Sequence, residues 1–445
     1  MSARLKYLHY VVVNSFWFVP TVLLLAAILL AVLSAILDRA MQATWSRELA
    51  WVLWVGPDGA RTILQVIAGS MIGATSLVFS MTLVSLTLAS QQLGPRLLAI
   101  FRADRPTQVA LGVFVSTLAY ALMMLRLIRP QGDSTSDFVP LASVTMAQLL
   151  TLFSLAVLIY FIHHLAELLQ ADTVVAHVGD ALDGSVRSLF PATSEPEDGS
   201  RQQEEAAGPG PSGRFCLVVP SARTGYVQTI AVAQLVGLAE QSDGRIELQV
   251  MAGDFLVPGQ AVARFWPLDR ATEALKERIR DGLTIGPKRT QAEDLEYAAN
   301  ALVEIALRAL SPSLNDPFTA IASIDRIGAA LALAIGRADP PLEHRDAAGR
   351  LRLTLPSRGF VDLLEGSFDD IRRAGADHPA VLRTLAARLA GLAELAADPE
   401  RRAAIWRQGE ALRRLVGRRL DEPLDRQRVD VELERLDERL ARWDG

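Results

Sequence analysis

The chain has 445 residues, a formal net charge of −5 and one cysteine, which excludes an intramolecular disulfide framework. A mean hydropathy of +0.24 is rare for a soluble domain of this size, and the uneven split of charge along the chain excludes a simple cytosolic enzyme. Residues 1–165 hold 10 of the 45 Lys and Arg residues and 6 of the 50 Asp and Glu residues, a net charge of +4 against −9 for the remainder. The composition therefore predicts a membrane unit followed by an acidic unit in water. With no basic stripe, nucleic acid is not an expected partner.

Four apolar runs without charged residues predict transmembrane helices at Phe16–Leu37, Ile63–Ala89, Val109–Leu125 and Phe138–Ile162. A bilayer core of roughly 30 Å needs about 20 apolar helical residues, and each run is near or above that length. The third run is the shortest, so a buried core helix remains an alternative there. The first run exceeds the roughly 7–15 residues of a signal-peptide core, so we do not expect it to be cleaved.

The charges around the first run predict the orientation of the chain. Arg4 and Lys6 precede the run, whereas Asp38 and Arg39 follow it. This difference favours a cytoplasmic N-terminus, because positive charge is retained on that side. With four spans, the C-terminus and the acidic half are expected in the cytoplasm too.

The second run contains one narrow helical stripe of small or hydroxylated side chains, recurring every three or four residues. Its members are Gly69, Gly73, Ser76, Ser80, Val84, Thr87 and Gln91. Two interpretations stay open: tight helix packing inside one subunit, helped by the small pair Gly69 and Gly73, or the lining of a central path in a homo-oligomer. The central parts of the four runs lack Asp, Glu, Lys and His, which argues against a proton-driven transporter but not against a channel.

The sequence after the membrane region predicts a linker and a small β-rich domain. We assign residues 1–170 to the membrane region, 171–213 to a linker and 214–267 to the β-rich domain. Pro, Gly, Ser and Glu crowd the second half of the linker and leave little to bury. The Gly253–Gly259 segment is similar to the half-motif of lipoyl- and biotinyl-like barrels. It contains no lysine, so no covalent cofactor is expected.

Residues 268–445 predict a helical domain. Thr290 to Glu293 read T-Q-A-E, the pattern of a capping box at a helix start. Further on, Pro312 ends one helix and Asp316 caps the next, with Pro317 at its first position. This stretch is either a structural joint alone or part of a polar site for an ion or small anion. The candidate residues of that site are Arg289, Asp294, Asn315 and Asp316.

Three stretches carry a resemblance to a known family: residues 79–86 with 91–98, the Gly253–Gly259 hairpin, and Ala309–Ala320. The chain resembles a family of uncharacterised bacterial integral membrane proteins, a domain of unknown function described as a predicted membrane protein. The resemblance implies four membrane helices before a soluble region, in the bacterial inner membrane. It implies no activity.

No nucleophile–base pair, phosphate-binding loop or metal-ligand motif occurs, so we expect neither an enzyme nor a bound cofactor or metal. The adjacent His163 and His164 would point about 100° apart on a helix and are poorly placed for one ion. The function that the sequence favours is a homo-oligomeric, channel-like conduit with a cytoplasmic regulatory domain. The alternative is a membrane-anchored sensory or scaffolding protein whose soluble half binds a ligand or partner.

Overall fold

The structure is a computed structural model that describes residues 15–41, 56–92, 94, 104–128, 140–168, 170–192, 216–290 and 293–443. The chain forms two compact units, Met1–Thr173 and Val174–Gly445, and each is described by itself. The charges that predict the orientation before the first helix, Arg4 and Lys6, lie outside the described residues. So does most of the Pro- and Glu-rich half of the predicted linker.

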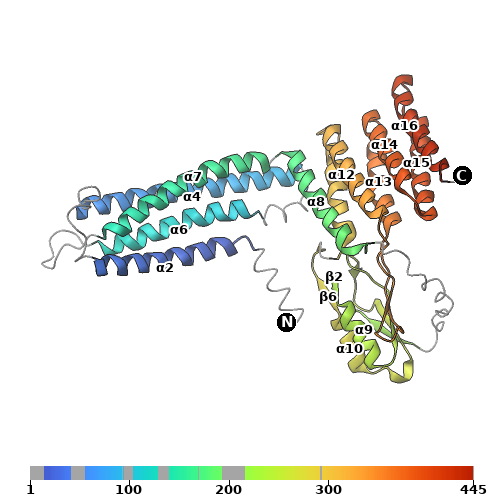
Figure 1. The fold of residues 1–445 in the computed structure, drawn as a ribbon, viewed down its shortest axis with the longest axis horizontal. Coiled ribbons are helices and arrows are strands. Elements are labelled where there is room, and N and C mark those ends of the chain that lie inside the picture. The colour runs from blue at the N-terminus through green and yellow to red at the C-terminus, as the bar shows by residue number, and fades with distance from the viewer. Residues whose placement is uncertain are drawn as a thin grey trace. The chain divides into compact units, whose positions relative to one another are not determined.

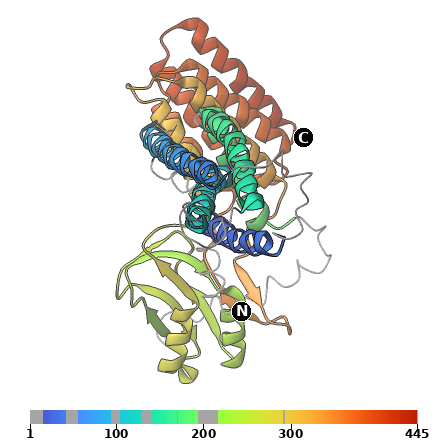
Figure 2. The ribbon, with the colours of Figure 1, turned by 90° about the vertical axis from the view of Figure 1, so that its left-hand side faces the viewer.

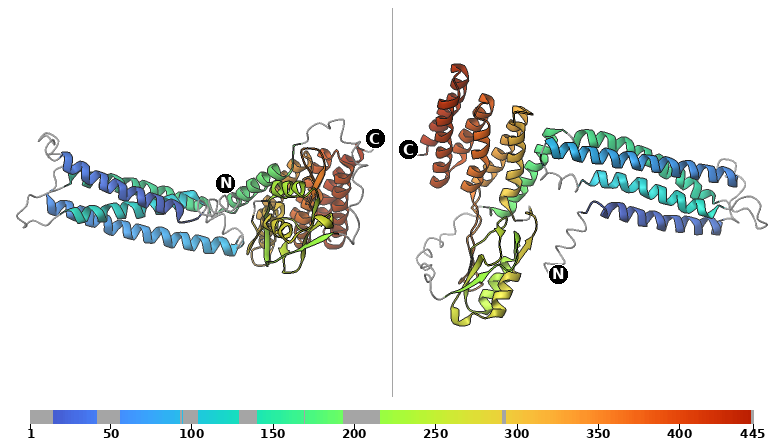
Figure 3. Two further views of the ribbon diagram at one scale, coloured as in Figure 1. Left: turned by 90° about the horizontal axis from the view of Figure 1, so that it is seen from below. Right: turned by 180° about the vertical axis from the view of Figure 1, so that it is seen from behind.

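The first unit is a bundle of long apolar helices that run side by side (Figures 1 and 3). The helices described are α2 (Phe18–Met41), α4 (Pro57–Gln92), α6 (Arg105–Leu127) and α7 (Leu141–Leu168). Each coincides closely with one of the four predicted runs, although Phe138 lies outside the described residues. Helix α6 packs against the other three helices and is the most buried of them. The third predicted run therefore forms the central, most buried helix of this bundle.

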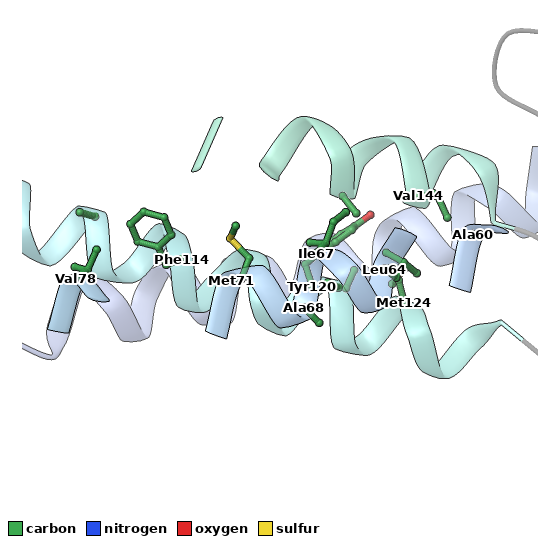
Figure 4. Close-up of a cluster of buried hydrophobic side chains, with 14 of the residues drawn as sticks. Ala60, Leu64, Ile67, Ala68, Met71, Val78, Phe114, Tyr120, Met124 and Val144 are labelled. Atoms are coloured by element: carbon green, nitrogen blue, oxygen red, sulfur yellow. The ribbon is translucent and has the colours of Figure 1, made fainter. Parts of the chain in front are cut away.

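Large side chains of α4 and α6 fill the core of this bundle (Figure 4). Leu64, Phe114 and Tyr120 are at most 1% exposed. Buried polar groups find partners across helices: the Thr117 and Ser154 hydroxyls are 2.9 Å apart. Helix α6 begins after Asp104, whose carboxylate accepts a hydrogen bond from the Thr107 amide at 2.9 Å, the arrangement of an N-cap.

The carboxylate of Asp38, in the last turn of α2, is buried in the bundle. This carboxylate accepts hydrogen bonds from the backbone N–H groups of Ala142 and Ser143, both at 3.0 Å, and from the Ser143 hydroxyl. Those amides belong to the first turn of α7 and have no partner within their own helix. Asp38 therefore caps a helix that begins about a hundred residues later in the chain.

Five of the described helices are long and apolar enough to cross a membrane, by length and composition. Four are the helices of the first unit. The fifth is α12 (Pro317–Ile335), which the sequence analysis places in the helical domain. Helix α12 packs against α11, α13 and α14 in the second unit.

The second unit begins within α8 (Ala171–Leu189), at Val174, and continues into two small β-sheets. Its strands are β1 (Leu217–Pro220), β2 (Gly225–Ile230), β3 (Arg245–Leu248), β4 (Phe255–Leu256), β5 (Ala261–Trp266), β6 (Leu283–Gly286), β7 (Glu343–Arg345) and β8 (Leu351–Thr354). One sheet has the order β1-β5-β3-β8-β7 and the other β4-β2-β6. Every pairing is antiparallel except the parallel pair β3–β8. Gly253 and Gly259 both have positive φ, which glycine adopts without strain.

Short helices cover the sheets, and longer helices form a separate layer of the same unit. The short ones are α9 (Val232–Gln241), the 3₁₀ turn η4 (Leu268–Arg270) and α10 (Glu273–Asp281). The longer ones are α11 (Leu295–Ala309), α12, α13 (Phe360–Ala374), α14 (Pro379–Leu395), α15 (Pro399–Arg419) and α16 (Pro423–Ala441). In Figure 2 most of the strands gather with α9 and α10, in green to yellow, while β7 and β8 are orange and α13 to α16 are orange to red.

The structure corrects three sequence-based boundaries. Residues 171–189 form α8 rather than the start of a linker, because Val174, Val178 and Leu182 give it a buried face. The predicted boundary at residue 267 does not separate strands from helices, since β6, β7 and β8 follow it. The Thr290–Glu293 capping box is absent: α11 begins at Leu295, and Glu293 instead accepts the backbone N–H of Ile230 at 2.8 Å.

Candidate functional sites

The stripe on α4 faces away from the rest of its bundle. All seven of its residues are exposed: Gly69, Gly73, Ser76, Ser80, Val84, Thr87 and Gln91. The buried residues of the same helix are Ala60, Leu64, Ile67, Ala68, Met71, Val78 and Ser85. At about 100° per residue, these two sets lie on roughly opposite sides of the helix. The stripe is therefore not the surface that joins α4 to its neighbours.

The contacts of individual stripe residues agree with this placement. A Cβ built on Gly69 or Gly73 meets no atom within 4 Å. The hydroxyl of Thr87 donates back to the Leu83 carbonyl at 2.9 Å. Within the described part of the chain, the Ser76 and Ser80 hydroxyls make no such bond, although other hydroxyls of α4 do. Tight packing of the stripe inside one subunit is not what the structure has.

Two of the four residues predicted for a polar site do come together in the second unit. The guanidinium of Arg289 donates to the carboxylate of Asp294 from Nε at 2.5 Å and from Nη2 at 2.7 Å. Asp294 is 2% exposed, and its hydrogen bond raises the pKa of Arg289. Gly253 fits against the pair, because a Cβ there would lie 2.6 Å from an Asp294 oxygen. The glycine of the hairpin thus makes room for a buried ion pair.

This ion pair extends into a chain of charged side chains that ties several segments together. Arg289 reaches Glu296 at 3.4 Å, and Glu296 accepts from Arg358 at 2.9 Å. Arg358 also lies 3.9 Å from Asp254 in the hairpin. Three carboxylates and two guanidinium groups alternate, so every charge has an opposite neighbour. The chain of charges connects the Gly253 hairpin, the start of α11 and the segment that leads into α13.

The other two predicted residues, Asn315 and Asp316, lie past the opposite end of α11. That helix has 15 residues and is about 22 Å long at 1.5 Å per residue, which separates them from Asp294. Asp316 accepts from the amides of Phe318 and Thr319 at 3.1 and 3.2 Å and caps α12. Asn315 has φ of +46°, a conformation that asparagine tolerates. The four residues therefore form no common site, and the joint has the predicted cap.

A cavity of about 290 Å³, which no sequence pattern predicted, opens in the second unit. Ten of its lining residues are apolar: Leu189, Ile230, Val232, Met251, Ala252, Leu295, Pro340, Pro341, Leu355 and Pro356. The polar ones are Ser188, Glu293, His344, Ser357 and Arg358. Because these residues come from widely separated parts of the chain, no local pattern could have revealed the cavity. The three prolines, which carry no backbone N–H, were the nearest signal.

Two titratable side chains in this cavity are shifted toward their neutral forms. Burial raises the pKa of Glu293, against the lowering effect of the Ile230 N–H that binds its Oε2 atom. Burial also lowers the pKa of His344. Neither side chain has an oppositely charged partner among the described residues. Shifted groups that line a cavity are typical of functional sites.

The two adjacent histidines at the end of α7 have separate partners. His164 Nε2 lies 3.0 Å from Asp104, the residue that caps α6, and Tyr160 stacks on the imidazole. His163 pairs with Glu167 at 3.3 Å and is well exposed. Within the described ranges, no three His, Cys, Asp or Glu side chains gather as metal ligands would.

A bundle of long apolar helices joined in sequence to an acidic α+β unit defines a membrane protein. The model of a family described as "Predicted membrane protein (DUF2254)" matches residues 13–391, and the chain belongs to that family. Uncharacterized protein Mb1321c of Mycobacterium bovis and uncharacterized protein Rv1290c of Mycobacterium tuberculosis are each 35% identical to it over 377 residues. The matches cover 84% of this chain and 71% of each relative. No solved structure matches the chain.

Proposed function

We propose that the chain forms homo-oligomers in the bacterial inner membrane and that the α4 stripe lines a conduit through them. The observation that carries the proposal is the outward-facing stripe, whose Ser76 and Ser80 hydroxyls have no partner within the described subunit. Lipid offers such groups no hydrogen bonds, and leaving a hydroxyl without one in an apolar medium costs free energy. Water in a path, or a second subunit, would satisfy them.

The proposal includes four membrane spans with both termini in the cytoplasm, and it places α12 in the water-exposed unit. Asp325 and Arg326 lie at the middle of α12, where charged groups in a span would be costly. Asp325 pairs with Arg388 of α14 at 3.2 Å, and Arg326 pairs with Asp180 of α8 at 3.3 Å. These ion pairs favour a core helix of the second unit. The proposal assigns no catalytic reaction to the chain.

The conduit is tested by oligomeric state and ion flux together. Native mass spectrometry of the detergent-purified chain should give a closed oligomer, and liposomes that contain it should release trapped potassium chloride. Ser80→Leu should slow that release, because a large apolar side chain dewets a narrow path. Phe79→Leu alters the neighbouring apolar surface of the same helix and should leave release unchanged. A strict monomer, or equal release from both variants, contradicts the conduit.

A second candidate function is supported by the cavity of the second unit: recognition of a small molecule by the soluble half of a membrane-anchored sensor. The lining of this cavity is mostly apolar with a few polar groups, which is typical of ligand sites. Ala252→Trp would fill the cavity. A small molecule that copurifies with the wild-type chain and is lost from this variant supports the candidate. A bound molecule retained by the variant contradicts it.

A further inference from the structure

We infer that the cavity of the second unit binds a small organic cation, a primary amine on an apolar body, with its ammonium group at the Glu293 carboxylate. The inference deepens the second candidate function and rests on it. It does not depend on whether α4 lines a conduit.

The charge of the cavity lining favours a cationic ligand. Among the described residues that line the cavity, Arg358 is the one strong cation, and it is already engaged by Glu296 and Asp254. The chain of charges to which Arg358 belongs holds three carboxylates against two guanidinium groups. Ionised Glu293 would add a further negative charge, and no salt bridge joins it to a cation among the residues that the structure describes. The uncompensated charge at this site is therefore negative, and it favours a cationic ligand over an anionic one.

The hydrogen-bonding groups of the cavity suit an ammonium group. A primary ammonium group has three N–H donors and no acceptor. The cavity offers acceptors with no other partner among the described residues: the second oxygen of Glu293, the imidazole of His344 and the hydroxyl of Ser357. Because burial lowers the pKa of His344, the ring stays neutral and keeps an acceptor nitrogen. The polar side of the cavity thus matches an ammonium group.

The size of the cavity and its apolar walls suit a compact ligand. A volume of about 290 Å³ is at the small end of ligand pockets. Most of the lining is aliphatic or proline and would contact a compact hydrocarbon or aromatic body, whose burial contributes about 25 cal/mol per Å². The further ammonium groups of a polyamine would lie against these apolar walls. A ligand with one amine on an apolar body places its only charge at the polar side of the cavity.

The test is isothermal titration calorimetry on the full-length chain in detergent with three probes of matched shape. These are 2-phenylethylamine, 2-phenylethanol and phenylacetate, which are cationic, neutral and anionic at neutral pH. We expect the amine to bind at least about tenfold more tightly than the alcohol, a difference of about 1.4 kcal/mol, and phenylacetate not to bind. Glu293→Gln should remove the preference for the amine. Glu240→Gln, an exposed carboxylate on α9 away from the cavity, should retain it.

The pH dependence of amine affinity gives a second readout that a merely structural role for Glu293 would not move. Pairing with an ammonium group favours the ionised carboxylate, so the amine affinity of wild type should fall as pH falls through the pKa of Glu293, and that of Glu293→Gln should change less. Titrations at a series of pH values measure this dependence. The other charged or titratable residues of the lining are His344 on β7 and Arg358, while α8 and β2 contribute none.

The possible outcomes separate this inference from the candidate function beneath it. Equal affinity for amine and alcohol, no loss of amine binding in Glu293→Gln, or no amine binding at all overturns the inference. Binding of the alcohol or of phenylacetate that is lost in Ala252→Trp overturns the amine class but leaves ligand recognition standing. A melting curve of each variant, with the cooperativity of wild type, shows that it is folded.

Discussion

Replacing Asp38 by alanine should be among the most damaging single changes in the membrane unit. The substitution leaves two amides at the buried start of α7 without an acceptor, together with the Ser143 hydroxyl. Each buried donor left unpaired costs about 1–3 kcal/mol. With partial relaxation, since the hydroxyl can rotate toward a carbonyl of its own helix, the total loss is about 2–5 kcal/mol. Asp38→Asn keeps one acceptor oxygen and should lose about 1–2 kcal/mol.

The assay is reversible unfolding in mixed micelles by SDS titration, followed by far-ultraviolet circular dichroism. A matched control is Asp316→Ala, which removes a helix cap of the same chemistry from a half-exposed position in the second unit. The comparison isolates burial, because both residues accept hydrogen bonds from two amides of a first turn. A loss for Asp38→Ala no larger than that for Asp316→Ala would refute the reasoning.

Four further predictions concern the second unit and are measured by thermal unfolding of the full-length chain in non-ionic detergent. Asp316→Ala should cost about 0.5–2 kcal/mol, and a vanished flux with unchanged stability would contradict a purely structural joint. Gly253→Ala should lower the melting temperature at a cost of about 1–3 kcal/mol, because φ is +94° and the new methyl group meets the buried Arg289–Asp294 ion pair. An unchanged midpoint would argue against the packing of Gly253 on that ion pair. Burial raises the pKa of Glu293 above its ordinary value near 4.5, so folding is favoured as pH falls through the raised value. Glu293→Gln should therefore melt at or above the wild-type temperature at neutral pH. A lower melting midpoint would show that the folded chain needs the charge of Glu293. Arg352 lowers the pKa of Asp346 to about 2, so this pair stabilises the folded state above about pH 4, and the stabilisation is lost as pH falls through 2. Arg352→Met should therefore weaken the dependence of the melting temperature on acid pH. An unaltered dependence would contradict the pairing of Arg352 with Asp346.

Local sequence patterns predicted the parts of the fold that local forces determine. Uncharged apolar runs located the helices of the membrane unit, because a long stretch without charges has few other stable forms. Asp316 caps α12 as its position before a proline indicates.

Features that depend on distant partners were not predictable in the same way. The T-Q-A-E pattern favours a capping box, yet the Ile230 amide, 63 residues away, binds Glu293 instead. Strand β8 pairs in parallel with β3, about a hundred residues earlier, and no local signal reports such a partner. The buried cap at Asp38 and the lining of the cavity have the same origin, since each arises only when separate segments pack together.

Predicting which residues would share a site failed for a related reason. Arg289 and Asp294 are five residues apart and meet, whereas Asn315 and Asp316 are separated from them by the length of α11. The stripe on α4 was identified from its spacing. Only the packed bundle reveals that the stripe points outward, because spacing fixes which residues share a face but not what that face contacts.

The most direct test of the conduit is the reactivity of single cysteines along α4. In a Cys216→Ala background, cysteines at Ser76, Ser80 and Thr87 should react with a membrane-impermeant, water-soluble thiol reagent in intact liposomes. Cysteines at Val78, buried in the bundle, and at Phe79, on the apolar side of the same helix, should stay protected. Reaction confined to the three stripe positions is what the account predicts. Uniform protection of all three would contradict a water-filled path along α4.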